Sequence, residues 1–225
     1  MMGYNVIMKI DILTIFPEMF ASPFGDSIVK RAISESKVEI NLHNLREWAT
    51  DKHRSVDDRP FGGGAGMVMR VDIIDQAVSA LKAGSSHSKV ILLDTKGKFY
   101  TQQDAQKLAK AEHLIFIVGH YEGVDQRVIE HVADAVYSIG PYVLTGGELP
   151  TMVVVDSIVR LLPGVISSES LEEESYTSGP EQIEYPQYTR PAGYQGWKVP
   201  EILLGGHHAE IDSWRSGKTR EKAKK

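Results

Sequence analysis

Apolar runs alternate with amphipathic stretches along most of the chain. Five runs have the length and the Ile, Val and Leu content of strands, and they span residues 9–16, 38–45, 90–93, 113–118 and 136–139. The stretches between them, two of which place apolar residues on one helical face, predict helices over residues 26–36, 71–81, 102–111, 124–132 and 149–162. Strands that alternate with helices are typical of a parallel α/β fold. We therefore expect an α/β domain over residues 8–163.

Two of these strands differ in which faces they bury. In residues 38–45, Val38, Ile40 and Leu42 alternate with polar residues. Side chains of a strand alternate between its two faces, so these three are expected to face the core. The run 113–118 is almost entirely apolar, as expected for a strand that is covered on both faces.

The pattern changes after residue 163. Residues 166–187 are polar and Ser-rich and hold six acids without a Lys or Arg. They are interpreted as a linker or as a segment that becomes ordered on binding. Pro-punctuated pieces follow, and then a helical stretch over 201–215 with a basic end. The predicted organisation is an α/β domain over 1–165, a flexible acidic linker over 166–187 and a small helical domain over 188–225.

Composition and charge restrict the classes of function. The chain has 225 residues and no Cys, which excludes disulfides, thiolate nucleophiles and zinc–thiolate sites and fits the reducing cytoplasm. No apolar run reaches the roughly 18 residues that span a bilayer, so no membrane association is expected. No secretory signal precedes the first strand, and residues 1–7 are interpreted as an extension upstream of a start at Met8. The net charge of −5 argues only weakly against nucleic acid, because residues 215–225 hold six bases and one acid.

Two glycine-bearing loops directly follow two of the predicted strands. They span residues 119–127 and 138–150, and a third loop, 94–97, follows the strand 90–93. Glycine brings backbone N–H and C=O groups close to a ligand, and ligands of parallel sheets lie at the carboxyl ends of the strands. The loops therefore predict one crevice walled by backbone, although each alone would also fit an ordinary turn. No G-x-G-x-x-G follows a strand and no G-x-x-x-x-G-K-[ST] occurs, which argues against a nicotinamide or triphosphate pocket.

Residues 46–70 interleave basic side chains with Trp48 and Phe61 and include a glycine-rich run at 62–66. The basic residues are Arg46, Lys52, His53, Arg54, Arg59 and Arg70. Positive charge holds phosphates and flat rings stack on bases, so the segment fits a loop that faces RNA. Acids at Asp51, Asp57 and Asp58 partly neutralise it, and a solvated loop with its rings in the core would give the same pattern.

Seven motifs are distributed over the chain: residues 15–20 (IFPEMF), 49–53 (ATDKH), 56–58 (VDD), 61–67 (FGGGAGM), 119–125 (GHYEGVD), 142–150 (YVLTGGELP) and 188–191 (YTRP). In this order they resemble the bacterial tRNA (guanine-N1)-methyltransferases, which modify the guanosine directly 3′ of the anticodon. The resemblance covers essentially the whole chain. It implies the SPOUT fold, an α/β domain with a deep C-terminal trefoil knot. It also implies that S-adenosylmethionine is the methyl donor and that Mg²⁺ supports the reaction. It further implies a homodimer in which each active site uses both chains.

The resemblance also implies catalytic residues. Methylating guanine at N1 requires that the N1 proton leaves and that the charge spreading onto O6 is stabilised. By position, Glu174 would be the base, where the family commonly has Asp, and Arg160 would be its electrostatic partner. Without the resemblance, Arg160 could simply cap its helix, and Glu174 could be one more solvated acid of the acidic segment.

The implied binding residues belong to the loops already described. The backbone-rich cofactor site would comprise Thr95, Gly97, Gly119, Tyr121, Glu122, Gly123, Ser138, Ile139, Gly140, Pro141, Tyr142, Val143, Leu144, Gly146, Gly147 and Pro150. Contacts to tRNA would come from Asp51, Lys52, His53, Arg54, Asp57 and Glu122. Two positions depart from the family pattern: Thr95 stands where Pro is usual, and Pro141, which has no N–H to donate, stands where Asp is usual.

Three other functions remain open from the sequence. A knotted methyltransferase acting on another RNA, such as ribosomal RNA, would have the same loops. A catalytically silent RNA-binding protein that retains the fold would explain the departures at Thr95, Pro141 and Glu174. A nicotinamide oxidoreductase shares the fold class, but the missing glycine fingerprint counts against it.

Overall fold

A computed structural model describes residues 7–84, 87–177, 179 and 182–222. The expected N-terminal extension lies outside the described residues, except for Ile7. The chain forms two compact units, Met1–Ile166 and Ser167–Lys225, and each is considered by itself.

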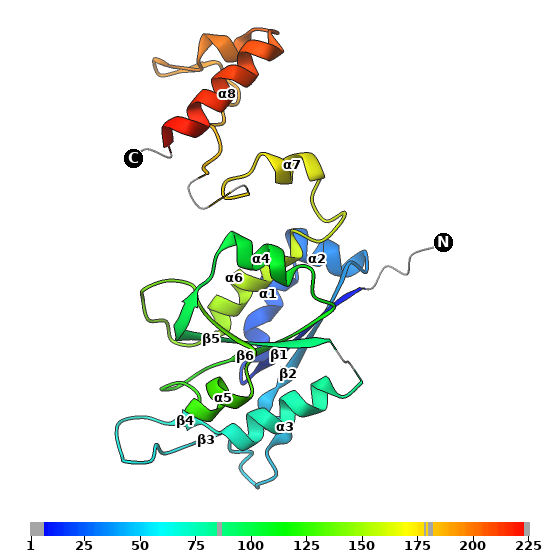
Figure 1. Ribbon diagram of the computed structural model, residues 1–225, viewed down its shortest axis with the longest axis vertical. Helices are drawn as coiled ribbons and strands as arrows, with labels where there is room; N and C mark the ends of the chain where they lie inside the picture. The colour runs from blue at the N-terminus through cyan, green and yellow to red at the C-terminus, as the bar shows by residue number, and fades with distance from the viewer. Residues whose placement is uncertain (1–6, 85–86, 178, 180–181, 223–225) are drawn as a thin grey trace. The chain divides into compact units, whose positions relative to one another are not determined.

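A five-stranded parallel sheet forms the centre of the first unit (Figure 1). The strands lie in the order β2-β1-β6-β5-β7. Their bounds are β1, Met8–Thr14; β2, Val38–Asn44; β5, Ser88–Phe99; β6, His113–Val118; and β7, Ala135–Ser138. Every neighbouring pair is parallel, so the predicted parallel α/β architecture is confirmed.

Helices cover both faces of this sheet (Figure 1). One face carries α1 (Ala21–Phe24), α2 (Ser27–Ser34), α4 (Gln102–Leu108) and α6 (Glu148–Val159), and the other carries α3 (Val71–Lys82) and α5 (Gln126–His131). The buried side chains form two apolar clusters, as expected when both faces of a sheet are covered. In β6 all six residues are buried, which fits its central position and its almost entirely apolar sequence.

Short elements complete the first unit. The 3₁₀ helices η1 (Pro17–Phe20) and η2 (Leu45–Trp48) follow β1 and β2, and the two-residue strands β3 (Asp57–Asp58) and β4 (Val68–Met69) pair antiparallel. The start of α4 is fixed by a capping box, in which the Thr101 hydroxyl accepts from the backbone N–H of Asp104 and the Asp104 carboxylate accepts from that of Thr101.

Two details of the sheet differ from the prediction. Strand β5 does not end at Leu93 but continues to Phe99, through the segment predicted to be a loop, with a shift of register between Leu93 and Lys98. In β2, Leu42 was expected to face the core but is 37% exposed. The strand lies at the edge of the sheet, so its inward face is only partly covered toward its end.

The second unit contains short elements and one long helix. They are α7 (Ser168–Glu172), the paired strands β8 (Gly193–Tyr194) and β9 (Trp197–Lys198), the 3₁₀ helix η3 (Glu201–Leu204) and α8 (His208–Lys222). Helix α7 lies within the predicted acidic linker. A hydrogen-bonded turn follows it, in which Tyr176 N donates to Gln182 O at 2.7 Å. The linker therefore has local structure that its polar sequence did not predict.

Candidate active site

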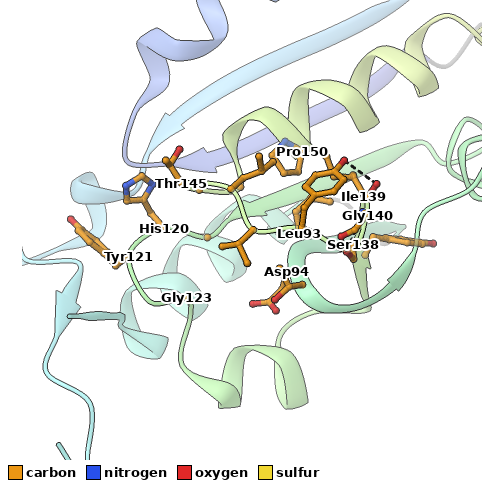
Figure 2. Close-up of a pocket in the computed structure, with 18 of the residues that line it drawn as sticks. Leu93, Asp94, His120, Tyr121, Gly123, Ser138, Ile139, Gly140, Thr145 and Pro150 are labelled. Atoms are coloured by element: carbon orange, nitrogen blue, oxygen red, sulfur yellow. Dashed lines mark hydrogen bonds between the residues drawn. The ribbon is translucent and has the colours of Figure 1, made fainter. Parts of the chain in front are cut away.

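Residues 93–95 of β5 and the loops that follow β6 and β7 line one cavity (Figure 2). These three strands are neighbours in the sheet, so the loops predicted to form a crevice do converge. The backbone N–H of Gly147 donates to Gly119 O at 2.7 Å, which joins the loop after β7 to the loop after β6. A Cβ atom at Gly147 would lie 3.0 Å from Gly119 N and 3.2 Å from Gly119 O, so any larger residue would push the two loops apart by a few tenths of an ångström.

Most of the predicted cofactor residues line this cavity. All of them do so except Gly97 and Pro141. A Cβ atom at Gly97 would lie 2.6 Å from the backbone of Tyr137, so Gly97 allows the bulged part of β5 to pack against β7. The cavity also includes lining residues that the sequence analysis did not select, namely Leu93, Asp94, His120, Tyr137 and Thr145. Four of them lie directly beside selected residues, so the loops rather than single residues were the useful signal.

The loop after β7 presents main-chain groups to the cavity. Tyr142 Oη donates to Ile139 O at 3.3 Å, and Ser138 Oγ donates to Gly140 O at 3.0 Å. These two hydrogen bonds hold the turn in place. Among the described residues, none accepts a hydrogen bond from the backbone N–H groups of Tyr142, Val143 and Leu144. Unpaired main-chain donors beside a cavity are available to a ligand.

Acidic side chains also lie at the cavity. Asp94 and Glu122 are among its lining residues. Asp94 Oδ1 accepts a hydrogen bond from Lys96 N at 2.8 Å, and the Glu122 side chain lies against Gly66 of the glycine-rich turn. Tyr121, at φ +59°, and Gly123, at φ +113°, give the loop after β6 its sharp turn. The residue before them, His120, has its Nδ1 atom 3.5 Å from Oε2 of the buried Glu148. Thr14 Oγ1 donates to the other oxygen of Glu148 at 3.4 Å.

The basic segment 46–70 is joined to the cavity through backbone hydrogen bonds. Met69 N donates to Gly123 O at 3.0 Å, and Glu122 N donates to Met67 O at 3.0 Å. The glycine-rich turn before β4 carries Phe61, whose side chain is fully exposed. The structure therefore places this aromatic loop and the cavity loop side by side in the first unit.

The residues predicted to contact RNA differ in their local roles. Lys52, His53 and Arg54 are exposed. Asp51 accepts hydrogen bonds from His53 N and from Ser55 N and Oγ, so it organises the turn that carries them. The bonds from Ser55 hold the pKa of the Asp51 carboxyl below its ordinary value. Asp57 belongs to β3.

The two predicted catalytic residues fall in different units. Arg160 is the C-cap of α6 in the first unit, and its backbone N–H donates to Asp156 O at 3.1 Å. Glu174 lies in the second unit, where its carbonyl accepts a hydrogen bond from Thr177 N at 3.4 Å. Both side chains are partly buried.

No group of three or more His, Asp or Glu side chains in the described ranges could hold a metal ion. Likewise, no helix within the described part of the chain is long and apolar enough to cross a membrane.

The fold and the cavity define an α/β protein with a parallel sheet and a cleft lined by β5 and by the loops after β6 and β7. Residues 8–225 match the family model described as tRNA (Guanine-1)-methyltransferase TrmD. The chain therefore belongs to the tRNA (guanine-1)-methyltransferase family, which confirms the resemblance indicated by the sequence motifs.

Curated relatives agree with this assignment. A tRNA (guanine-N(1)-)-methyltransferase of Ruminiclostridium cellulolyticum is 53% identical over 210 residues, which cover 92% of this chain and 89% of the relative. Proteins of the same name from Chloroflexus aggregans and Shouchella clausii are 53% and 54% identical, over 92% of this chain and 81% and 85% of their own lengths.

Proposed function

We propose that the protein transfers a methyl group from S-adenosylmethionine to N1 of the guanosine directly 3′ of the anticodon in tRNA. The observation that carries the proposal is the cavity formed by residues 93–95 of β5 and by the loops after β6 and β7, because these two loops contain two of the family's longest motifs. Family membership supports the reaction and the tRNA substrate. With such a substrate, the expected location is the cytoplasm.

The cavity has chemistry that suits S-adenosylmethionine. Its adenine ring carries hydrogen-bond acceptors, which the free N–H groups of Tyr142, Val143 and Leu144 can satisfy. Its sulfonium is a cation, and the carboxylates of Asp94 and Glu122 lie among the lining residues. When bound, the cofactor supplies an electrophilic methyl group.

Two side chains of the chain would manage the proton and the charge of the target base. Glu174 accepts the N1 proton of guanine as a general base. The Arg160 guanidinium, which stays protonated at all working pH values, stabilises the negative charge that develops on O6. Glu122, which lines the cavity, would accept hydrogen bonds from the edge of the guanine.

RNA contacts are proposed for the basic segment and for the second unit. The exposed side chains of Lys52, His53 and Arg54 suit phosphates, and the fully exposed ring of Phe61 suits stacking on a base. Asp51 and Asp57 would complete this surface. The domain over residues 188–225 would bind tRNA, and residues 166–187 would become more ordered when it binds. Equal rates of proteolysis in 166–187 with and without tRNA would contradict that ordering.

A homodimer is proposed because α6 is apolar on most of its surface. Leu149 and Val153 of this helix are 50% and 52% exposed. The neighbouring η1 segment adds Phe16 and Met19, which are 41% and 44% exposed. A contiguous apolar face of this kind usually packs against a partner, and here the partner would be a second copy whose residues complete each active site.

Two further properties of the family are the trefoil knot and the support of the reaction by Mg²⁺. The structure offers support only for the knot. The trefoil knot is supported by the bond from Gly147 N to Gly119 O, which brings the chain after β7 back to the loop after β6 before α6 begins. For Mg²⁺, the described residues offer no cluster of ligands. No step of the proposed reaction is therefore assigned to the ion.

The experiment that tests the proposed function compares two tRNA transcripts that differ only in the nucleotide after the anticodon. Methyl transfer from labelled S-adenosylmethionine is expected to the transcript with guanosine and not to the transcript with adenosine. Equal labelling of both, or labelling of ribosomal RNA instead, would reject the proposed site of methylation. Absence of binding to S-adenosylhomocysteine would favour a catalytically silent RNA-binding protein.

A further inference from the structure

The second unit contains a cavity between residues 185–192, η3 and α8, which we call the C-terminal cavity. All of its lining residues belong to Ser167–Lys225. It encloses about 400 Å³, which lies within the range of about 300–1,000 Å³ that is typical of small-ligand pockets. The cavity is therefore large enough for one nucleobase.

Aromatic rings form part of its wall. Tyr188 and Trp214 lie with their ring centroids 6.4 Å apart and their planes tilted by 56°. Tyr188 remains 48% exposed, and Trp214 is only partly buried. Rings that pack the interior of a small domain are normally more deeply buried, so these two have faces available for stacking.

Two guanidinium groups give the wall its charge. Arg215 stacks on the ring of Tyr185, with Cζ 4.7 Å from the ring centroid. Its Nε atom is buried and has no hydrogen-bond partner among the described residues. Among the described residues, Arg215 forms one ion pair, and it is long: Nη1 lies 3.9 Å from Asp212 Oδ1. Arg190 is exposed, and no carboxylate lies among the lining residues.

This combination identifies the kind of ligand. A buried donor without an acceptor is costly, so Arg215 Nε calls for an oxygen acceptor that the described residues do not supply. Arginines beside aromatic faces are the usual recognition surface for an unstacked nucleotide, because the guanidinium binds the phosphate and the ring binds the base. A purely apolar ligand would leave Arg215 Nε without an acceptor.

We propose that the C-terminal cavity binds one unstacked nucleotide of the RNA substrate. Its base stacks on Trp214 and Tyr188, and its phosphate is held by Arg190 and Arg215. The proposal rests on the proposed tRNA substrate and adds a second point of contact for that RNA, outside the catalytic loops.

The test measures tRNA affinity for variants of the full-length protein at one salt concentration. Trp214→Leu and Arg190→Gln are each expected to raise the Kd for tRNA about five-fold or more, since stacking and phosphate contacts have about this strength. Trp214→Phe, which keeps an aromatic face, should retain most of the affinity. The matched controls are Trp197→Leu and Lys198→Gln, which remove an aromatic ring and a positive charge from β9, outside the cavity. Since β9 belongs to the same proposed tRNA-binding domain, each control is expected to weaken tRNA binding less than the corresponding cavity variant does.

Folding and function are checked separately. The cofactor cavity belongs to the first unit, so S-adenosylhomocysteine binding should not change in any of these variants. Ultraviolet crosslinking of bound tRNA to the wild type, followed by mass spectrometry, should identify a nucleotide on the peptide that contains Tyr188 or Trp214. Crosslinking supports the site even where a variant fails to fold.

Three results would overturn the proposal. Wild-type affinity for tRNA in both Trp214→Leu and Arg190→Gln, with no crosslink in residues 185–215, would reject the site while leaving the methyltransferase activity intact. Failure of the wild type to bind or methylate any tRNA would reject the proposed function as well. Binding of adenosine 5′-monophosphate, with tRNA affinity unchanged in the variants, would assign the cavity to a free nucleotide.

Discussion

His113 Nε2 lies 2.7 Å from Asp11 Oδ2, and both side chains are buried within the central sheet. Asp11 also accepts hydrogen bonds from His43 Nε2 at 2.9 Å and Asn41 Nδ2 at 3.1 Å, and Lys9 Nζ lies 2.9 Å away. These partners come from β1, β2 and β6, so one carboxylate joins three neighbouring strands. The network takes no part in the proposed reaction, and we infer that its role is in stability.

Asp11→Asn is expected to lower the free energy of unfolding by about 3 kcal/mol, because buried partners would lose the charge that they face. Urea unfolding at neutral pH measures this loss. The exposed Asp75 on α3 provides the control, and Asp75→Asn should change the free energy by about 0.5 kcal/mol or less. Equal stability of Asp11→Asn and the wild type would show that the network is dispensable.

The same network predicts a pH dependence. Burial alone would raise the pKa of the Asp11 carboxyl, but the bonds from His43, Lys9, His113 and Asn41 together lower it well below its ordinary value. Such a group contributes stability above its unfolded pKa of about 4, and that contribution is lost as the pH falls further. Between about pH 5 and about pH 3, the wild type should therefore lose more stability than Asp11→Asn does. Parallel losses would contradict the assignment.

The close contact between Gly147 and Gly119 predicts that the affinity for the cofactor depends on how tightly the two loops pack. In Gly147→Ala, the new Cβ would meet the backbone of Gly119 at 3.0 Å, so the two loops must separate. We expect the affinity for S-adenosylhomocysteine to fall about ten-fold, which corresponds to about 1.4 kcal/mol. Gly206→Ala is the control, because a Cβ there meets nothing within 4 Å. Unchanged affinity in Gly147→Ala would show that the ligand does not depend on this junction.

Glu174→Gln tests the proposed base. It should leave S-adenosylhomocysteine binding unchanged and lower methyl transfer about 100-fold or more, the usual range for a general base. Glu172→Gln removes the same charge two residues earlier, at the exposed end of α7, and should keep normal turnover. Turnover of Glu174→Gln within about ten-fold of the wild type, or about 1.4 kcal/mol of barrier, would remove Glu174 from this role.

Val153→Lys tests the proposed dimer. A lysine in the middle of an apolar interface would be desolvated without a partner, so this variant should sediment as a monomer where the wild type is a dimer. Ser79→Lys introduces the same charge at an exposed position of α3, on the other face of the sheet, and should stay dimeric. A dimeric Val153→Lys protein would place the interface elsewhere.

The sequence predicted the first unit well because periodicity reports burial. The strand 113–118 matches β6 at both ends, since nearly every residue in it is apolar and it is flanked by the acid Glu112 and by Gly119. The extension of β5 to Phe99 was missed, because its polar residues look like a loop. That extension depends on Gly97 lying against the backbone of Tyr137, a contact between distant residues that no local pattern reveals.

In the candidate site, the sequence predicted the loops better than it predicted the individual lining residues. Glycine-bearing loops behind strands were enough to place most of the cavity wall. Asp94 and His120 belong to these loops but were not selected as individual binding residues, because a single polar residue in a loop has no periodic context. Helix α7 was missed for a similar reason, since a five-residue helix in an acidic segment has almost no apolar pattern to detect.

Backbone groups of residues 93–95 and of the loops after β6 and β7 are proposed to hold the methyl donor. Amide hydrogen exchange with and without S-adenosylhomocysteine measures this directly, because it reports on the N–H groups themselves. Slower exchange is predicted in residues 119–123 and 139–147, including the N–H groups of Tyr142, Val143 and Leu144. Unchanged exchange in both segments at a saturating ligand concentration, or protection confined to other parts of the chain, would contradict the claim.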